Sequence, residues 1–262
     1  MKISIFGTGY VGLVTAGCLA NKNHNVICYD ISIDIIKKLD DGIVPIFEPG
    51  LDDLIAQGVG SGKLVFTSSP EEPLKDPDII ILCVGTPDIG TGATSLKAIE
   101  SCAKTISELS NQPVSVLIKS TVPVGTSTKV QNLINKGLKD RKVDIKIPVA
   151  SNPEFLREGV AISEFYHPDK IVLGTNDEQV VEAVYKLYKD LMPESQEILV
   201  MSPESSELTK YASNAFLATK ISYMNEISQF CSLTGANIDD VRKGMGPDPN
   251  IAPGFLYAGC GF

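Results

Sequence analysis

The sequence predicts an α/β fold, in which a doubly wound, mostly parallel sheet is followed by a long central helix and the start of a helical middle domain. Over residues 1–200, short apolar runs alternate with longer amphipathic stretches, as is typical of a sheet covered by helices on both faces. A glycine-rich turn follows the first apolar run, and after residue 200 the alternation gives way to one uninterrupted helical stretch. We therefore expect one domain over residues 1–200 and an incomplete middle domain over residues 201–262.

The expected strands are short and rich in Ile, Val and Leu. They are Ile3–Phe6, Val26–Tyr29, Leu64–Phe66, Ile79–Val84, Val114–Ile118, Ile145–Ala150, Ile171–Leu173 and Ile198–Val200. The main helices expected among them are Val11–Ala20, Ile33–Leu39, Leu96–Leu109, Thr126–Gly137 and Glu178–Leu191. Most of these helical patterns lie between two strand patterns, so they provide the crossovers that parallel strands need.

The long helix begins with Ser202 as its N-cap and Pro203 in the first position. No Gly or Pro interrupts it before Gly235, which gives roughly 30 residues and a length of about 45 Å. Its apolar side chains cover too much of the circumference for a one-sided surface helix, so we expect burial between domains or in a homodimer. A shorter helix over Ile238–Lys243 and a Gly/Pro-rich tail follow.

Composition excludes several classes of function. The net charge of −9 disfavours nucleic acid as a partner, and no apolar run approaches the ~18 residues of a membrane span. The amino terminus enters a strand directly, without the regions of a signal peptide, so we expect a cytoplasmic protein. The six cysteines form no C-x-x-C pair and there are only two histidines, so no metal site is expected.

The first loop carries the motif Gly7-Thr8-Gly9-Tyr10-Val11-Gly12. It follows a strand, opens a helix and is followed by Asp30 at the end of the second strand, a context that indicates a Rossmann-like dinucleotide site. The glycines let the pyrophosphate approach the helix N-terminus. Asp30 would accept hydrogen bonds from the ribose hydroxyls and repel a 2′-phosphate, which favours NAD over NADP. The alternative is an ordinary tight turn.

Two threonines follow neighbouring strands. Thr86 lies in Cys83-Val84-Gly85-Thr86-Pro87, and Thr121 lies in Ser120-Thr121-Val122-Pro123-Val124-Gly125. Ligands of open α/β sheets sit at the carboxyl ends of strands, so both side chains are placed to reach a cofactor or substrate. The alternative is that both threonines only cap turns.

Two clusters of polar residues are candidates for chemistry. The octapeptide Asn152–Gly159 is expected to open a short helix, on which Glu154 and Glu158 share a face. On the long helix, Lys210 and Asn214 are also four residues apart within an otherwise apolar surface. A buried Lys needs an anionic partner, such as a substrate alkoxide or Glu154. We expect the two clusters to converge on the nicotinamide. The alternatives are a solvated acidic face and a lysine that extends to the surface.

These residues resemble the UDP-glucose/GDP-mannose dehydrogenase family. The resemblance runs through the whole chain in order, and Asn152–Gly159 is its most specific part. The other matching segments are Gly7–Leu13, Val84–Pro87, Lys119–Gly125, His167–Lys170 and Lys210–Asn214. Together with Thr121–Gly125, the octapeptide points to the UDP-glucose branch rather than the N-acetylmannosamine branch.

The resemblance implies a two-step, four-electron oxidation of the sugar C6 alcohol to a carboxylate with two NAD. It places Val11, Asp30, Thr86, Thr121 and Glu158 at NAD. UDP-glucose would be held by Glu154, Phe155, Leu156, Arg157, Glu158, Lys210, Asn214, Phe255, Leu256, Tyr257, Ala258 and Gly259. Lys210 and Asn214 would stabilise the developing oxyanion, and Glu154 would be the general base in thioester hydrolysis. Thr121 is the fourth catalytic candidate.

The family's nucleophile is a Cys in a Gly-Phe-Gly-Gly-Ser-Cys-type segment. Gly261-Phe262 match its beginning, so we expect that Cys about four residues further on, and Cys260 precedes the motif. The UDP-binding C-terminal domain of the family is also expected to lie outside this chain. We therefore expect weak NAD binding and no turnover by residues 1–262 alone.

Two other interpretations stay open. The first is a two-electron NAD-dependent hydroxyacid dehydrogenase, which also joins an NAD domain to a long helix carrying Lys and Asn. The segments Asn152–Gly159 and Phe255–Gly259 argue against it. The second is a non-catalytic nucleotide-binding or subunit-interaction fragment, with the long helix as its interface.

Overall fold

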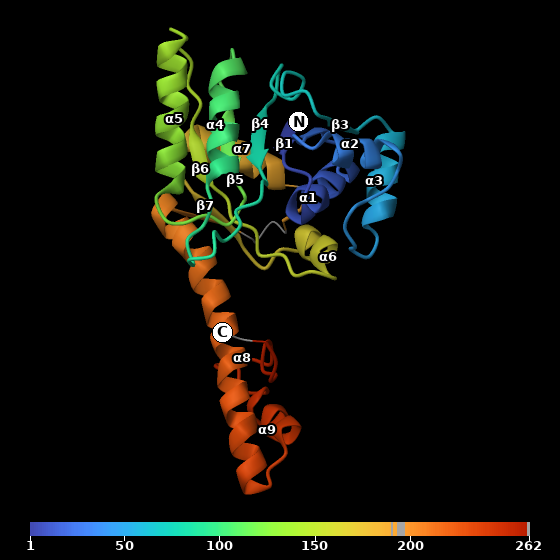
Figure 1. Cartoon of the computed structure of the whole chain (residues 1–262), viewed down its shortest axis with the longest axis vertical. Helices are drawn as coiled ribbons and strands as arrows, with labels where there is room; N and C mark the ends of the chain where they lie inside the picture. Colours follow the sequence, from blue (N-terminus) through green and yellow to red (C-terminus); the bar gives the residue numbers. More distant parts are fainter. Residues whose placement is uncertain (190, 193–196, 261–262) are drawn as a thin grey trace. The chain divides into compact units, whose positions relative to one another are not determined.

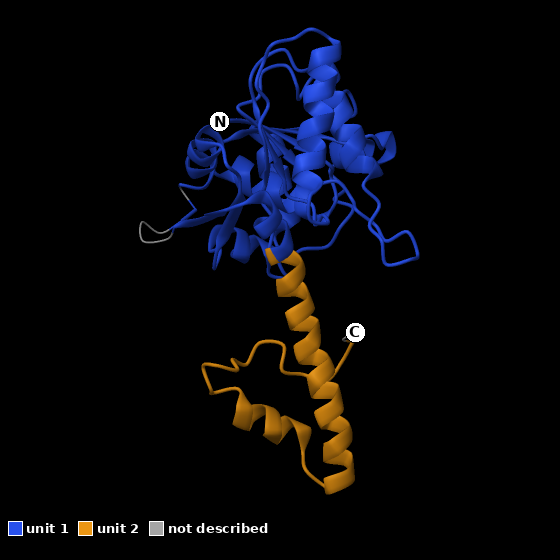
Figure 2. Cartoon of the chain, turned by 90° about the vertical axis from the view of Figure 1, so that its left-hand side faces the viewer, with its two compact units in different colours: residues 1–208 blue, residues 209–262 orange. Residues whose placement is uncertain are grey.

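The structure is a computed structural model that describes residues 1–189, 191–192 and 197–260. The chain forms two compact units, residues 1–208 and residues 209–262, coloured blue and orange in Figure 2. The division lies inside the long helix, whereas the sequence suggested a boundary at residue 200, before that helix.

The first unit contains a sheet whose strands follow the order β3-β2-β1-β4-β5-β6-β7-β8 in its described part (Figure 1). The strands are β1 (Lys2–Phe6), β2 (Asn25–Tyr29), β3 (Leu64–Thr67), β4 (Ile79–Leu82), β5 (Ser115–Ile118), β6 (Val149–Ser151), β7 (Ile171–Gly174) and β8 (Ile198–Met201). All neighbours are parallel except β6 and β7. The mostly parallel α/β sheet that the sequence predicted is confirmed.

Helices cover both faces of this sheet because its central strands are apolar on both sides. In β4, Ile79 and Ile81 join the core on one face, beneath α1, α3, α6 and α7, while Ile80 and Leu82 join the core beneath α4 and α5. The helices are α1 (Tyr10–Asn21), α2 (Ile33–Asp40), α3 (Leu51–Gly60), α4 (Lys97–Leu109), α5 (Thr126–Asp140), α6 (Ala161–Tyr166), α7 (Glu178–Tyr188), α8 (Pro203–Thr234) and α9 (Ile238–Met245).

The strand order reverses beside β1. The chain moves from β1 outward to β2 and β3, and then returns to β4 on the other side of β1. The loops after β1 and β4 therefore leave the sheet in opposite directions, and a crevice opens between them at the carboxyl ends of the strands. This is the position at which the fold can bind a ligand.

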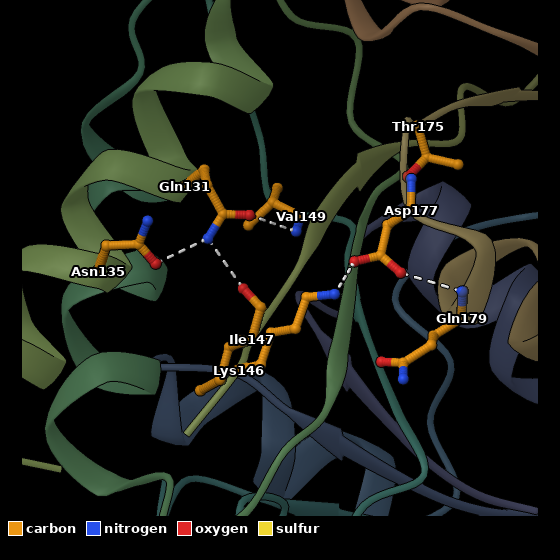
Figure 3. Close-up of polar contacts among 8 residues, drawn as sticks. All are labelled: Gln131, Asn135, Lys146, Ile147, Val149, Thr175, Asp177 and Gln179. Atoms are coloured by element: carbon orange, nitrogen blue, oxygen red, sulfur yellow. Dashed lines mark hydrogen bonds and ion pairs between the residues drawn. The ribbon is translucent and has the colours of Figure 1, made fainter. Parts of the chain in front are cut away.

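The sheet is interrupted between β6 and β7, which are joined only at Ser151 and Gly174 in the described residues. The side chain of Gln131, on α5, takes the place of a strand partner here (Figure 3). Its amide nitrogen donates to the carbonyl of Ile147 at 3.0 Å, and its oxygen accepts from the Val149 N–H at 2.8 Å. These bonds satisfy backbone groups that a continuous ladder would otherwise pair.

Two helices were not predicted, α3 and α6. Helix α3 contains Gly58 and ends at Gly60, and glycine lowers helix propensity. Gly58 allows a close approach to β3, because a Cβ there would lie only 3.0 Å from the Cβ of Leu64. Helix α6 has only six residues, too few to show a helical period.

Helix α8 has 32 residues, so the prediction of one long helix is confirmed. Within the single chain, several of its large apolar side chains are exposed rather than enclosed, among them Phe216, Tyr223, Phe230 and Leu233. Burial of this helix in a dimer therefore stays a prediction. No helix in the described part of the chain combines the length and apolarity needed to cross a membrane.

Candidate functional site

A pocket of about 460 Å³ lies at the carboxyl ends of β1, β4 and β5, in the crevice of the first unit. Eight of the predicted site residues line it: Gly7, Gly9, Tyr10, Val11, Asp30, Thr86, Thr121 and Glu154. They come from separate stretches of sequence, and the strand order brings them together. Gly12, which was also predicted to contact the cofactor, does not line the pocket.

The glycines of the turn differ in what a side chain would meet: Gly7 and Gly12 are sterically required, whereas Gly9 is open. Gly7 has a φ of +103°, and a Cβ there would lie 2.7 Å from the carbonyl oxygen of Cys83. Gly12 lies in the first turn of α1, where a Cβ would overlap the carbonyl oxygen of Gly7. A Cβ on Gly9 would meet nothing within 4 Å, so this position opens into free space. The turn thus leaves room for a ligand to approach its backbone at Gly9.

The amino terminus of α1 is available to a ligand. Gly9 is its N-cap and supplies no side-chain hydrogen bond to the first turn. The first N–H groups of a helix have no partner within the helix and carry partial positive charge, so they attract an anion such as a pyrophosphate.

Asp30 lies beside this turn at the end of β2. Its carboxylate accepts hydrogen bonds from the N–H and the hydroxyl of Thr8, at 2.9 and 2.8 Å, and from the Ser32 N–H at 2.9 Å. These bonds fix the orientation of the carboxylate at the pocket. An ionised carboxylate held in this way accepts hydrogen bonds from ribose hydroxyls and repels a 2′-phosphate.

The loops after β4 and β5 are tied together at the pocket. The Thr86 hydroxyl donates to the carbonyl of Thr121 at 2.8 Å, and the Ser120 hydroxyl donates to the carbonyl of Val84 at 2.7 Å. The Thr86 contact is therefore of the kind expected if this threonine caps a turn. Thr86 also lines the pocket together with Thr121, so the two roles are compatible.

The 152–159 segment is not a helix, which corrects the prediction made for it. Two of its N–H groups bond to carboxylates instead of to helical carbonyls: Glu154 accepts from Leu156 at 2.5 Å, and Glu164 accepts from Arg157 at 2.6 Å. Local side-chain bonds of this kind compete with helix formation. Glu154 lines the pocket, whereas Glu158 is exposed and lies outside the lining. The inference that the two carboxylates share a helical face is therefore wrong.

Lys119 was not singled out from the sequence as a site residue, although it follows the fully buried strand β5. It is buried, lines the pocket, and its Nζ lies 3.2 Å from the Tyr188 hydroxyl and 3.4 Å from Oδ1 of Asn152. Burial lowers the pKa of Lys119, but the Tyr188 oxygen and nearby Cys83 and Glu154 offset this, so its pKa lies above the ordinary value. The pocket therefore has a buried cation beneath it, anchored to the start of the 152–159 segment.

Glu207, the fifth residue of α8, connects this helix to the loop that carries Thr121. Its carboxylate is buried and accepts from the N–H groups of Gly125 and Ser127, at 2.6 and 2.7 Å, and from the Ser127 hydroxyl at 2.7 Å. A carboxylate at this position caps the amino terminus of α5. No local sequence signal reveals this contact, because it joins residues about 80 positions apart.

The second unit carries Lys210, Asn214 and the predicted substrate residues 255–259. Lys210 is buried and Asn214 is exposed on α8, and their convergence with Glu154 stays a prediction. Asn225 holds the tail to α8. Its side-chain amide donates to the Gly259 carbonyl and accepts from the Gly259 N–H, each at 2.8 Å. Within the predicted substrate segment, Leu256 is buried and the rings of Phe255 and Tyr257 stack with centroids 6.1 Å apart.

Comparisons with known proteins agree with this geometry. Residues 1–192 match the NAD-binding domain of the UDP-glucose/GDP-mannose dehydrogenase family, and residues 204–262 match the family's central domain. A UDP-glucose 6-dehydrogenase of Pseudomonas aeruginosa is 41% identical, and one of Bacillus subtilis is 45% identical. In both cases the alignment covers 100% of this chain but 58% of the relative.

Solved structures give the same result. A UDP-glucose dehydrogenase of Pyrobaculum islandicum superposes with a TM-score of 0.91 at 37% identity, over 100% of this chain and 60% of that one. A GDP-mannose dehydrogenase of Pseudomonas aeruginosa superposes with a TM-score of 0.88 at 34% identity, over 95% of this chain and 57% of that one. The glycine turn, the crevice and these matches show that the chain belongs to the UDP-glucose/GDP-mannose dehydrogenase family, with the family's NAD-binding domain over residues 1–192.

Proposed function

We propose that this chain contributes the NAD-binding part of a nucleotide-sugar dehydrogenase that oxidises UDP-glucose to UDP-glucuronate. Relatives at 41% and 45% identity are UDP-glucose 6-dehydrogenases, and the sequence of the 152–159 segment favours the same substrate. The observation that carries the proposal is the shared lining of one pocket by the glycine turn, Asp30 and Glu154.

The residues of this pocket fit NAD. The N–H groups that begin α1 would hold the pyrophosphate, with Val11 beside them, and Asp30 would bind the adenosine ribose. Thr86 and Thr121 would contact the nicotinamide end. When bound, NAD supplies the hydride acceptor, and two molecules used in succession account for the four electrons lost between a C6 alcohol and a carboxylate.

The proposed chemical roles are those that the resemblance to the family implies. Glu154 would take a proton from the water that hydrolyses the thioester, with Thr121 at the same pocket. Lys210 and Asn214 would stabilise the oxyanion. Glu158 does not line the pocket in this structure, and we propose that it also contacts NAD. The sugar nucleotide would contact residues 154–158 and 255–259.

The thiols at the pocket are poor nucleophiles. Cys83 and Cys102 line it, but burial raises the pKa of each to about 12, so neither supplies a thiolate near neutral pH. We therefore propose that residues 1–262 alone give no steady turnover, and we also propose that they bind NAD weakly. Continuous NADH production from UDP-glucose by the purified chain would overturn that part of the proposal.

Ligand specificity tests the proposed substrate without turnover. Saturation-transfer NMR with NAD present compares UDP-glucose, GDP-mannose and a 3-hydroxyacid as ligands of the chain. We expect transfer to UDP-glucose. Transfer to the hydroxyacid would favour a two-electron hydroxyacid dehydrogenase, and transfer to NAD alone would favour a non-catalytic nucleotide-binding module.

We also propose a homodimer formed through α8. The support is the exposure of Phe216, Tyr223, Phe230 and Leu233 on a single helix, since an exposed apolar surface of this kind is typical of protein interfaces. Light scattering should give the mass of a dimer for the wild type and of a monomer for Phe230→Lys combined with Leu233→Lys. A monomeric wild type would refute the proposal.

A further inference from the structure

Glu48 is a buried carboxylate in the loop between α2 and α3, outside the lining of the pocket. Its side chain is only 2% exposed. Oε2 accepts from the Tyr10 hydroxyl at 2.5 Å and from the Gly159 N–H at 2.7 Å, and Oε1 accepts from the Ala161 N–H at 2.8 Å. A buried carboxylate is costly unless it is well bonded, and here three donors from two other parts of the chain converge on it.

These donors belong to the two parts of the proposed site. Tyr10 is the first residue of α1 and lines the cofactor pocket. Gly159 ends the 152–159 segment and Ala161 begins α6. Because Glu154, five residues before Gly159, also lines the pocket, Glu48 holds one end of that segment to the helix that would receive the pyrophosphate.

The geometry of the segment explains why such an anchor matters. Residues 152–157 form no helix or strand, and Gly159 has a φ of +89°, so the backbone turns there in a way that a regular element would not produce. The two N–H bonds to Glu48 define where that turn sits. The path of the segment is therefore set by a side chain more than 100 positions earlier in the sequence.

We infer that Glu48 is a positioning residue that couples occupancy of the cofactor pocket to the conformation of the 152–159 segment, acting through Tyr10 on one side and the Gly159 and Ala161 amides on the other. This inference rests on the proposed function, because it takes the pocket to bind NAD and the segment to bind the sugar nucleotide. Binding of NAD beside Tyr10 thereby orders the segment that receives the substrate.

Hydrogen–deuterium exchange measures this coupling directly. Peptides covering residues 152–161 are followed with and without saturating NAD in the wild type, Glu48→Gln, Tyr10→Phe and the control Glu72→Gln, which changes an exposed glutamate. Calorimetry in parallel gives the NAD affinity of each protein, and thermal unfolding shows which variants are folded.

In the wild type and Glu72→Gln, NAD should slow exchange in these peptides severalfold. Tyr10→Phe leaves both amide bonds to Glu48, so slow exchange without NAD should persist while the additional effect of NAD is lost. Glu48→Gln places an amide NH₂ group at a position where only hydrogen-bond acceptors fit. Exchange in the 152–161 peptides should therefore be about tenfold faster even without NAD. The affinity for NAD should also fall, although residue 48 does not line the pocket.

Two outcomes would overturn the inference: wild-type protection by NAD in Tyr10→Phe, or a folded Glu48→Gln whose response to NAD equals that of the wild type. Should Glu48→Gln fail to fold, Tyr10→Phe still decides, because it retains the amide bonds. Absence of NAD binding by the wild type would instead refute the proposed function, and the exchange rates without NAD would still show whether Glu48 fixes the segment.

Discussion

Gly12 in α1 faces the carbonyl oxygen of Gly7 so closely that a Cβ at residue 12 would overlap it. The same turn leaves Gly9 open, because a Cβ at residue 9 would have no neighbouring atom within 4 Å. The first contact fixes the helix against the turn, whereas the second leaves space for a ligand. The two glycines should therefore respond differently to the same substitution.

Gly12→Ala should destabilise the fold by about 1–3 kcal/mol, because the added methyl forces the helix away from the turn. Urea unfolding followed by circular dichroism measures this. An unchanged unfolding midpoint would mean that the close contact is relieved at no cost, contrary to the packing described.

Gly9→Ala should leave the free energy of unfolding within about 1 kcal/mol of the wild type but weaken NAD binding at least about tenfold, or 1.4 kcal/mol. The methyl group would stand where the pyrophosphate approaches the backbone. Calorimetric titration with NAD measures the affinity, and wild-type affinity in this variant would place the cofactor elsewhere.

Gln131→Leu should cost about 1–3 kcal/mol of stability, because it removes the partner of the Val149 N–H and the Ile147 carbonyl at the gap between β6 and β7. Asn132→Ala, at the exposed neighbouring position of α5, is the matched control and should stay near the wild type. Equal denaturation midpoints for the two variants would show that the Gln131 side chain does not replace a strand.

Glu48 should make stability depend on pH. Burial alone raises its pKa, but the hydrogen bonds from Tyr10, Gly159 and Ala161 lower it below the ordinary 4.5. The folded pKa is thus below the unfolded one, so the stabilisation is fully present above the unfolded value and disappears as the pH falls through the folded value.

Urea titrations of the wild type and Glu48→Gln, between about pH 3 and pH 7, test this dependence. The difference in stability between the two proteins should be constant near neutral pH and shrink below pH 4.5. A difference that grows on acidification would contradict the assignment. Glu72→Gln serves again as the control.

Much of this fold follows from local patterns. The apolar runs of β1 and β4 and the helix-start signal at Pro203 each depend on neighbouring residues, and the structure places those elements close to the predicted ranges. The gathering of Asp30, Thr86 and Thr121 at one pocket follows from the rule that parallel strands end at a common edge.

The remainder depends on side-chain contacts that the helix and strand patterns do not reveal, some of them between residues far apart in sequence. Asn152 and Pro153 form a good helix start, yet the segment is not helical, and the carboxylates of Glu154 and Glu164 accept from the N–H groups of Leu156 and Arg157. Glu48 lies in a Pro- and Gly-containing loop with no local sign of its role. Its importance becomes visible only when Tyr10 and Gly159 are placed beside it.

We propose that the crevice beside β1 binds NAD and that Asp30 selects NAD over NADP. Calorimetric titration of the 262-residue chain with each dinucleotide tests this most directly. We predict one NAD per chain, NADP at least about tenfold weaker, and a much smaller difference between the two in Asp30→Ala. A folded wild type that gives no heat with NAD, or that binds NADP as tightly as NAD, would contradict the account.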